Sequence, residues 1–127
     1  MKSKRILVVD DEPMVVKALC KRLKDDGHLV VSANDGFEAL KIIQNQKLDL
    51  VISDIAMPYL NGLELVSYIK SNMIQNMPII LISALEEKEL VMAALKLNAD
   101  EYIVKPVNMT ELSLRIRGFI NKLREIN

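Results

Sequence analysis

The sequence predicts an α/β domain built on a doubly wound parallel sheet of five strands. Five short apolar runs alternate along the 127 residues with segments whose apolar residues recur at helical spacing. The runs are nearly continuous in Val, Ile and Leu, which is typical of parallel strands buried on both faces. Strand followed by helix, five times over, indicates this fold class with right-handed crossovers. Because no linker or composition shift divides the chain, we expect one domain over residues 1–127.

The first strand, predicted at residues 6–10, precedes the helix with the clearest signals. Its apolar stripe has the spacing i, i+3, i+4, i+7 and consists of Val16, Leu19, Cys20 and Leu23. Pro13 suits an early helical position, and Gly27 suits a helix end. These signals predict a helix that starts near Pro13 and ends before Gly27.

The later elements continue the alternation. A strand at 29–33 precedes a helix at about 35–46, in which we expect Phe37, Leu40 and either Ile42 or Ile43 to face the core. The remaining strands are predicted at 48–54, 79–83 and 102–104. The remaining helices are predicted at about 61–73, 86–97 and 108–124.

Composition argues against several classes of function. The 17 basic and 17 acidic residues balance, and no basic cluster is free of acids, so we expect no direct binding of nucleic acid. No apolar stretch approaches 18 residues, and the N-terminus does not resemble a signal peptide, so we expect no membrane segment. The single cysteine, Cys20, favours a reducing compartment such as the cytoplasm.

Polar side chains stand where four of the predicted strands end. Asp10 and Asp11 follow the first strand, Asp54 ends the third, Ser83 ends the fourth and Lys105 follows the fifth. In doubly wound sheets the ligand crevice lies beyond the carboxyl ends of the strands, so these residues are predicted to converge. The three carboxylates would repel one another unless a cation or a lysine neutralised them.

The chemistry of this set favours magnesium and phosphoryl transfer. Carboxylate oxygens without His or Cys suit Mg²⁺ better than a transition metal. An aspartate can act as a nucleophile and accept a phosphoryl group, whose oxygens then need a metal, a hydroxyl and a cation. Ser83 and Lys105 would supply the hydroxyl and the positive charge.

At these residues the chain resembles a receiver domain of the bacterial two-component response regulators, the CheY-like superfamily. The resemblance covers essentially the whole chain and rests on four motifs in the right order and spacing. The motifs are Val-Val-Asp-Asp-Glu at 8–12, Asp-Ile-Ala-Met-Pro at 54–58 with Gly62, Ser83-Ala84, and Tyr-Ile-Val-Lys-Pro at 102–106. The resemblance implies the family's strand order, 2-1-3-4-5.

The resemblance also implies a phosphoacceptor and a metal site. It implies that Asp54 takes a phosphoryl group from a histidine kinase or a histidine phosphotransfer protein. It implies that Mg²⁺ is bound directly by Asp11, Asp54 and the backbone carbonyl of Ala56, and by Asp10 through water. Such a domain catalyses only its own phosphorylation and dephosphorylation, so we expect no other enzymatic activity.

The resemblance also implies a two-component signalling switch, in which phosphorylation of Asp54 changes how the domain binds its partners. Ser83 would hydrogen-bond the phosphoryl group, and Lys105 would pair with it. Tyr102 would be the aromatic switch whose rotamer follows Ser83. The bond between Lys105 and Pro106 would be a cis peptide, a geometry that proline tolerates.

Two positions depart from the common family pattern near the phosphoacceptor. Ala56 and Leu85, two residues after Asp54 and Ser83, are apolar where the family often has polar residues. In the family these positions influence how fast the phosphoryl group is lost. A short-lived phosphorylated state is therefore not assumed.

The fourth helix also departs, because its run at 90–95 is too apolar to bury on one face. Exposed apolar surface usually marks a contact. Many DNA-binding members dimerise through charged pairs that link the fourth helix, the fifth strand and the fifth helix. The charges kept here are Asp100, Glu101, Glu111 and Arg115, whereas Val91 and Lys96 stand where a basic and an acidic residue are expected on the fourth helix. We expect this face, which includes Val91, Leu95, Glu101 and Arg115, to bind an output protein or domain, or a second copy of the chain, and to do so more through apolar contact than through charged pairs.

Taken singly, these residues have plainer interpretations. Asp54 could end a strand, Asp10 and Asp11 could cap the first helix, Ser83 could open a capping box with Glu86, and Lys105 could be solvated. Only their combination favours the switch over two rival functions. One rival is an interaction module that works without phosphorylation. The other is a magnesium-dependent phosphohydrolase, whose Asp-x-Asp spacing after the first strand is missing here.

Overall fold

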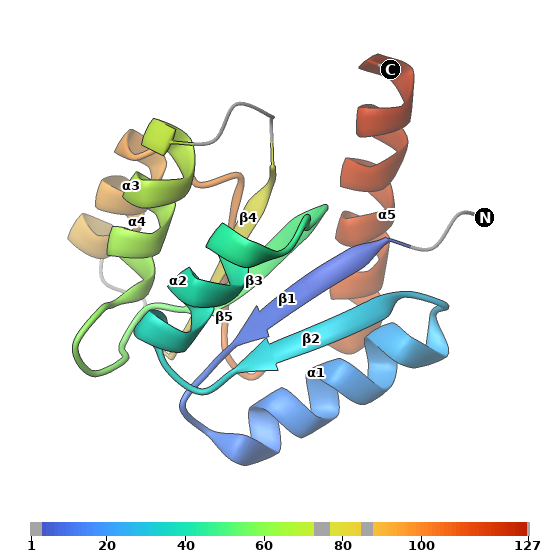
Figure 1. The fold of residues 1–127 in the computed structure, drawn as a ribbon, viewed down its shortest axis with the longest axis horizontal. Coiled ribbons are helices and arrows are strands. Elements are labelled where there is room, and N and C mark those ends of the chain that lie inside the picture. The colour runs from blue at the N-terminus through green and yellow to red at the C-terminus, as the bar shows by residue number, and fades with distance from the viewer. Residues whose placement is uncertain (1–3, 73–76, 85–87, 127) are drawn as a thin grey trace.

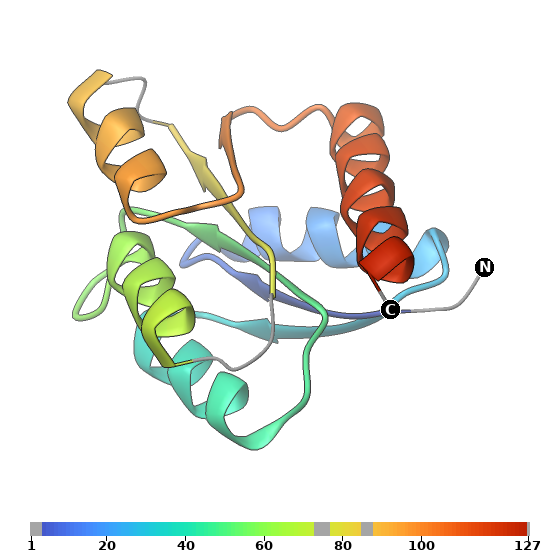
Figure 2. The same cartoon turned by 90° about the horizontal axis from the view of Figure 1, so that it is seen from above.

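The computed structural model describes residues 4–72, 77–84 and 88–126. A parallel sheet lies between two layers of helices (Figures 1 and 2). The strands are β1 (Arg5–Val9), β2 (Leu29–Ala33), β3 (Leu50–Asp54), β4 (Ile79–Ser83) and β5 (Glu101–Val104), in the spatial order β2-β1-β3-β4-β5. The helices are α1 (Pro13–Asp25), α2 (Gly36–Asn45), α3 (Gly62–Asn72), α4 (Lys88–Lys96) and α5 (Met109–Ile126). The predicted fold class and strand order are confirmed.

Each face of the sheet carries its own hydrophobic core. On one face the buried residues come from α2, α3 and α4, and on the other they come from α1 and α5. Strand β1 serves both, since Leu7 and Val9 join the first core and Ile6 and Val8 join the second. This period of two arises because successive side chains of a strand point to opposite faces. The helices therefore cover both faces of the sheet.

Burial along the strands separates the centre of the sheet from its edges. All five residues of β3 and of β4 are buried, as are four of the five in β1. The edge strand β5 is half-buried throughout, and β2 buries only Ala33. The expectation of strands buried on both faces is thus correct for the three central strands and wrong for the two edges.

The prediction for the core face of α2 was wrong at Phe37, whose side chain is 52% exposed. The buried positions are Gly36, Ala39 and Ile43. Gly36 lies so close to the Leu60 backbone that a Cβ there would overlap the Leu60 carbonyl oxygen. This close approach turns the Gly36 side of α2 inward and leaves the neighbouring Phe37 outside.

Helix boundaries agree with the predictions where they fall within the described residues. Helix α1 has Pro13 in its first turn, and Gly27 follows its end with a φ of 95°. A residue with a side chain rarely adopts that φ, which explains a glycine at this turn. The predicted ends at Met73 and Glu86 lie outside the described residues, as does the Glu86 half of the capping box. No helix in the described ranges combines the length and apolar character needed to cross a membrane.

Candidate metal and phosphoryl-transfer site

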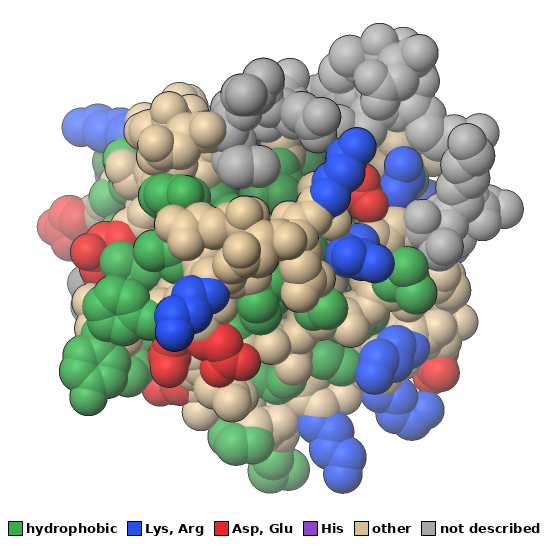
Figure 3. Space-filling view, in the orientation of Figure 1, with side chains coloured by type: hydrophobic (Ala, Val, Ile, Leu, Met, Phe, Trp, Pro, Cys, Tyr) green, Lys and Arg blue, Asp and Glu red, His purple; other side chains and the backbone are tan. Residues whose placement is uncertain are grey.

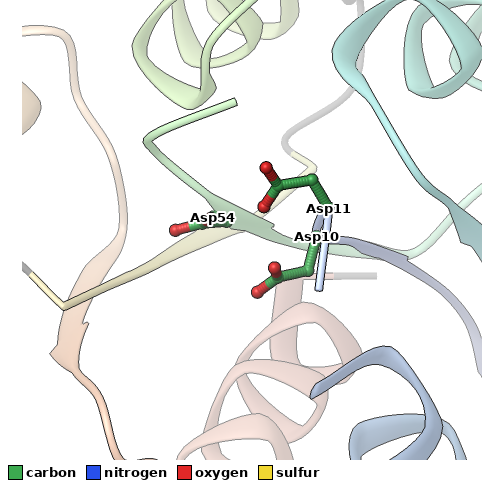
Figure 4. Close-up of side chains that lie close together, drawn as sticks. All are labelled: Asp10, Asp11 and Asp54. Atoms are coloured by element: carbon green, nitrogen blue, oxygen red, sulfur yellow. The ribbon is translucent and has the colours of Figure 1, made fainter. Parts of the chain in front are cut away.

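Three aspartates meet at the carboxyl end of the sheet. Asp10 and Asp11 follow the last residue of β1, and Asp54 is the last residue of β3. One carboxylate oxygen from each lies within 4.8 Å of the other two. Figure 4 shows Asp10 and Asp11 leaving the end of β1 on either side of Asp54. The neighbouring positions of β1 and β3 in the sheet thus bring together acids that are 44 residues apart in the sequence.

Two of these carboxylates are buried and held by the backbone. Asp10 is fully buried, and its Oδ1 accepts the Glu12 N–H at 2.9 Å. Asp54 is 4% exposed, and its Oδ1 accepts the Ile55 N–H at 2.9 Å. Asp11 is exposed. The site therefore combines two buried, hydrogen-bonded acids with one exposed acid.

Lys105 brings positive charge to the same place from the loop after β5. Its Nζ lies 2.9 Å from Oδ2 of Asp10, 3.1 Å from Oε1 of Glu12 and 3.7 Å from Oδ1 of Asp54. The backbone N–H of Lys105 donates to the Ser83 carbonyl at 2.8 Å, which extends the pairing of β5 with β4 by one residue. The Lys105–Pro106 peptide bond is cis, the geometry that the resemblance implies.

Electrostatics at the site follow from burial and crowding. The pKa of Asp54 is raised to about 6, first by burial and then by the charge of Asp10, and Lys105 and the Ile55 amide offset only part of this. Burial by itself would lower the pKa of Lys105. Its close contacts with the carboxylates of Asp10 and Glu12, together with the charge of Asp54, outweigh burial, so that its pKa is raised. Lys105 is therefore positively charged at neutral pH, whereas burial and the charge of Asp10 oppose ionisation of Asp54.

The other predicted site residues lie close by. Ser83 ends β4, is 1% exposed and pairs in register with Val104. Tyr102 lies half-buried on β5 and packs against the core under α2, α3 and α4. Ala56 is exposed two residues after Asp54, and Leu85 lies outside the described residues. All five predicted strand-end residues thus stand at one end of the sheet.

Two residues that the sequence analysis named only within motifs have structural parts of their own. Gly62 donates its N–H to the Ile55 carbonyl at 3.0 Å, and a Cβ on it would overlap the Asp54 carbonyl oxygen. Glu12 reaches across the site to Lys105. A glycine in a motif can signal that backbone segments approach closely, so Gly62 could have been identified from the sequence. The contact of Glu12 with Lys105 could not, because the two residues are 93 positions apart.

An exposed aromatic pair stands at the same end of the sheet. Phe37 opens α2, Tyr59 belongs to the loop between β3 and α3, and their ring centroids are 6.1 Å apart. Tyr59 is 82% exposed and has a positive φ of 69°. Figure 3 shows hydrophobic side chains gathered beside this loop. Sequence reasoning missed this surface because it placed Phe37 in the core.

The predicted partner face is apolar on α4 and internally paired on α5. Leu95 is 57% exposed, Met92 is 48% exposed and Val91 is half-buried. Arg115 binds Glu101 and Glu111, each at 2.8 Å. Asp100, which the sequence grouped with these charges, instead binds Lys70 at 2.9 Å. Arg115, Glu101 and Glu111 thus form ion pairs with one another within the chain.

Comparison with known proteins gives a consistent result. The family described as "Response regulator receiver domain" matches residues 6–117. The chain is 34% identical over 120 residues to the alkaline phosphatase synthesis transcriptional regulatory protein PhoP of Bacillus subtilis (strain 168), covering 94% of this chain and 50% of PhoP. It is 37% identical over 118 residues to response regulator MprA of Mycobacterium sp. (strain KMS), covering 93% and 51%. The chain therefore spans about half the length of these curated relatives.

Solved structures are similar over nearly the whole chain. A CheY-like receiver domain protein from Methanospirillum hungatei JF-1 superposes with a TM-score of 0.92 at 29% identity, covering 99% of this chain and 100% of that one. The response regulator protein TrrA from Thermotoga maritima, solved in complex with Mg(2+)-BeF, superposes with a TM-score of 0.82 at 38% identity, covering 91% and 98%.

Proposed function

Because the chain belongs to the response regulator receiver domain family, we propose that Asp54 is the residue that accepts a phosphoryl group in this member. Receiver domains of this family are the switches of two-component signal transduction. The observation that carries the assignment is the position of Asp54, a buried carboxylate at a strand end with two acids within 4.8 Å and an ammonium 3.7 Å away. An interaction module that works without phosphorylation has no need of this full set.

The proposed reaction transfers a phosphoryl group from a phosphohistidine of a kinase or a histidine phosphotransfer protein. A carboxylate oxygen of Asp54 forms a bond to phosphorus as the bond from phosphorus to the imidazole nitrogen breaks. The electron pair goes to the imidazole, which takes up a proton from water. The product is an acyl phosphate on Asp54. We propose no further enzymatic activity beyond this step and the hydrolysis of its product.

The residues present fit a magnesium ion. Three carboxylates converge, and hard oxygen donors of this kind suit Mg²⁺. We propose that Asp11, Asp54 and the backbone carbonyl of Ala56 hold it directly and that Asp10 does so through water. Magnesium supplies neutralisation of the phosphoryl oxygens when it is bound. The complex of TrrA with Mg(2+)-BeF supports this assignment by similarity.

Ser83, Lys105 and Tyr102 are proposed to respond to the phosphoryl group. The Ser83 hydroxyl would donate to a phosphoryl oxygen, and the Lys105 ammonium would pair with another. Tyr102 would change rotamer with Ser83. Phosphorylation shifts the balance between the two conformations of Ser83 and Tyr102 only if the phosphoryl group stabilises one of them more than the other. The new negative charge on Asp54 is proposed to provide that difference.

The proposed output surface is the face formed by α4, β5 and α5. Exposed Leu95 and Met92, with Val91 beside them, give an apolar contact area, flanked by the Glu101–Arg115 ion pair. We propose that it binds an output protein or domain, or a second copy of the chain. The two curated relatives described above are about twice as long as this chain, and PhoP is named a transcriptional regulatory protein, which supports an output in gene regulation. The single cysteine favours a cytoplasmic site of action.

Phosphorylation of the full chain with a small phosphodonor and Mg²⁺ tests the assignment. We expect an acid-stable, hydroxylamine-labile adduct on Asp54, detected by intact mass and peptide mapping. Asp54→Asn should abolish it, since an amide cannot form the acyl phosphate. Formation of the adduct at an unchanged rate in Asp54→Asn would contradict the proposal.

Sedimentation with and without phosphorylation tests the output surface. We expect the phosphorylated chain either to gain mass or to bind its output partner, and Leu95→Gln to weaken that association. Leu29→Gln is the matched control, because Leu29 is 56% exposed on the edge strand β2, away from this face. Equal behaviour of the two variants would exclude the α4–β5–α5 face as the site of contact.

A further inference from the structure

The Lys105 ammonium is shared unequally among three carboxylates. Its Nζ donates a hydrogen bond to Oε1 of Glu12 at 3.1 Å and forms an ion pair with Oδ2 of Asp10 at 2.9 Å. The contact with Asp54, at 3.7 Å, is longer than a hydrogen bond. A lysine ammonium has only three N–H donors, so each close partner limits where the others can point. The Lys105 ammonium therefore lies closer to Glu12 than to Asp54, the proposed phosphoacceptor.

The side chain of Glu12 contacts Lys105 and does not cap helix α1, although Glu12 stands at the N-cap position. It is the N-cap residue of α1, yet its side chain makes no capping hydrogen bond. Its backbone is fixed, because its N–H donates to Asp10 and its carbonyl accepts the N–H groups of Val15 and Val16. The side chain of Glu12 thus links the start of α1 to the loop after β5.

Exposure distinguishes Glu12 from the other partners of Lys105. The side chain of Asp10 is fully buried, and that of Asp54 is 6% exposed, whereas that of Glu12 is 62% exposed. An exposed ion pair is weak and is easily exchanged for water. Glu12 is consequently the partner that can release Lys105 when a stronger anion arrives.

We infer that Glu12 is a positioning residue for phosphoryl transfer, which holds Lys105 away from Asp54 before the reaction and competes with the phosphoryl group for it afterwards. This inference rests on the proposed function of Asp54. Glu12 then slows phosphorylation, because the Lys105 ammonium that would stabilise an incoming phosphoryl group is partly paired with Glu12.

Glu12→Gln tests the inference, because it removes the charge and keeps the length of the side chain. Lys105 should move into hydrogen-bonding distance of Asp54. The rate of phosphorylation by phosphoramidate with Mg²⁺ should rise by about two- to fivefold, the range expected for an exposed ion pair. The phosphorylated form should persist longer by a similar factor. The start of α1 should be unaffected, because the native side chain does not cap it.

Glu38→Gln is the matched control. Glu38 is an exposed acid in the first turn of α2, and its carboxylate accepts the N–H of Asn34 at 3.4 Å. The chain has no tryptophan, so the rates are followed by intact mass and not by fluorescence. Crystal structures of the wild-type chain and of Glu12→Gln supply the distance from Lys105 Nζ to Asp54 Oδ1.

Three results would overturn the inference: unchanged rates in Glu12→Gln, an equal change in Glu38→Gln, or a distance that stays at 3.7 Å in Glu12→Gln. Asp54→Asn serves as a separate check on the proposed function. If that variant is phosphorylated like the wild type, the assignment of Asp54 fails. The measured distance then still decides whether Glu12 positions Lys105.

Discussion

The two ends of the sheet treat their carboxylates in opposite ways. At the amino end, Asp49 accepts the N–H of Arg5 at 2.8 Å, and Asp100 accepts the N–H of Ile79 at 2.8 Å. Asp100 also binds Lys70 at 2.9 Å. At the carboxyl end, three aspartates crowd within 4.8 Å, and one ammonium serves several acids.

This difference shows where the fold gives up stability for function. Asp49 and Asp100 each accept a backbone N–H of their own, and Asp100 also has the ammonium of Lys70 as a counter-ion. At the carboxyl end, burial and like charge raise the pKa of Asp54 to about 6, so ionising it there is costly. A site that must receive a cation and a phosphoryl group needs such uncompensated negative charge. Stability is expected to rise when it is removed.

Gly62→Ala should have the largest effect, because it disturbs the backbone that carries Asp54. The new Cβ would overlap the Asp54 carbonyl oxygen, and backbone cannot move aside cheaply. We expect the free energy of unfolding to fall by about 3 kcal/mol, measured by urea denaturation with circular dichroism.

Gly118→Ala is the control for Gly62→Ala. Gly118 lies in α5, and a Cβ there would meet nothing within 4 Å. Alanine favours a helix over glycine, so this variant should gain about 0.5–1 kcal/mol. Similar effects of the two substitutions would mean that the start of α3 does not press on the phosphoacceptor strand.

Asp54→Asn should stabilise the chain by about 2 kcal/mol at pH 7.5 in the presence of a chelator. The folded pKa of Asp54, about 6, lies above its ordinary value of 3.8. The folded state therefore binds the proton more tightly than the unfolded state, and the wild type loses stability as the pH rises from about 4 through 6. The gain from asparagine should accordingly be full above pH 6 and should vanish as the pH falls toward 4. Urea denaturation across this range measures it, and a gain that did not depend on pH would contradict the electrostatic cause.

The strand-end residues could be found from the sequence because the fold rule places them. Once five apolar runs are recognised, Asp10, Asp54 and Ser83 must end neighbouring strands, and the carboxyl ends of parallel strands lie on one side. Lys105 follows by the same rule. The family's motifs then gave the chemistry that the positions alone left open.

Contacts between distant side chains could not be predicted in this way. Phe37 was assigned to the core because helical periodicity alone cannot tell which side of α2 is occupied, and Gly36 against Leu60 decides that. The bridge from Glu12 to Lys105 depends on side-chain reach across the site. The two edge strands were misjudged because an apolar run gives no sign of whether a strand has one neighbour or two.

The same substitution at the other end of the sheet, Asp100→Asn, gives the smallest effect and the opposite sign. Asparagine keeps an oxygen for the Ile79 N–H but loses the ion pair with Lys70, which is partly exposed. We expect a loss of about 0.5–1 kcal/mol in low salt, and a smaller loss in 1 M NaCl because salt screens the pair. Urea denaturation at the two salt concentrations measures both values. If Asp100→Asn stabilised the chain as Asp54→Asn is expected to do, both ends would hold uncompensated acids, and the contrast between a satisfied end and a functional end would be lost.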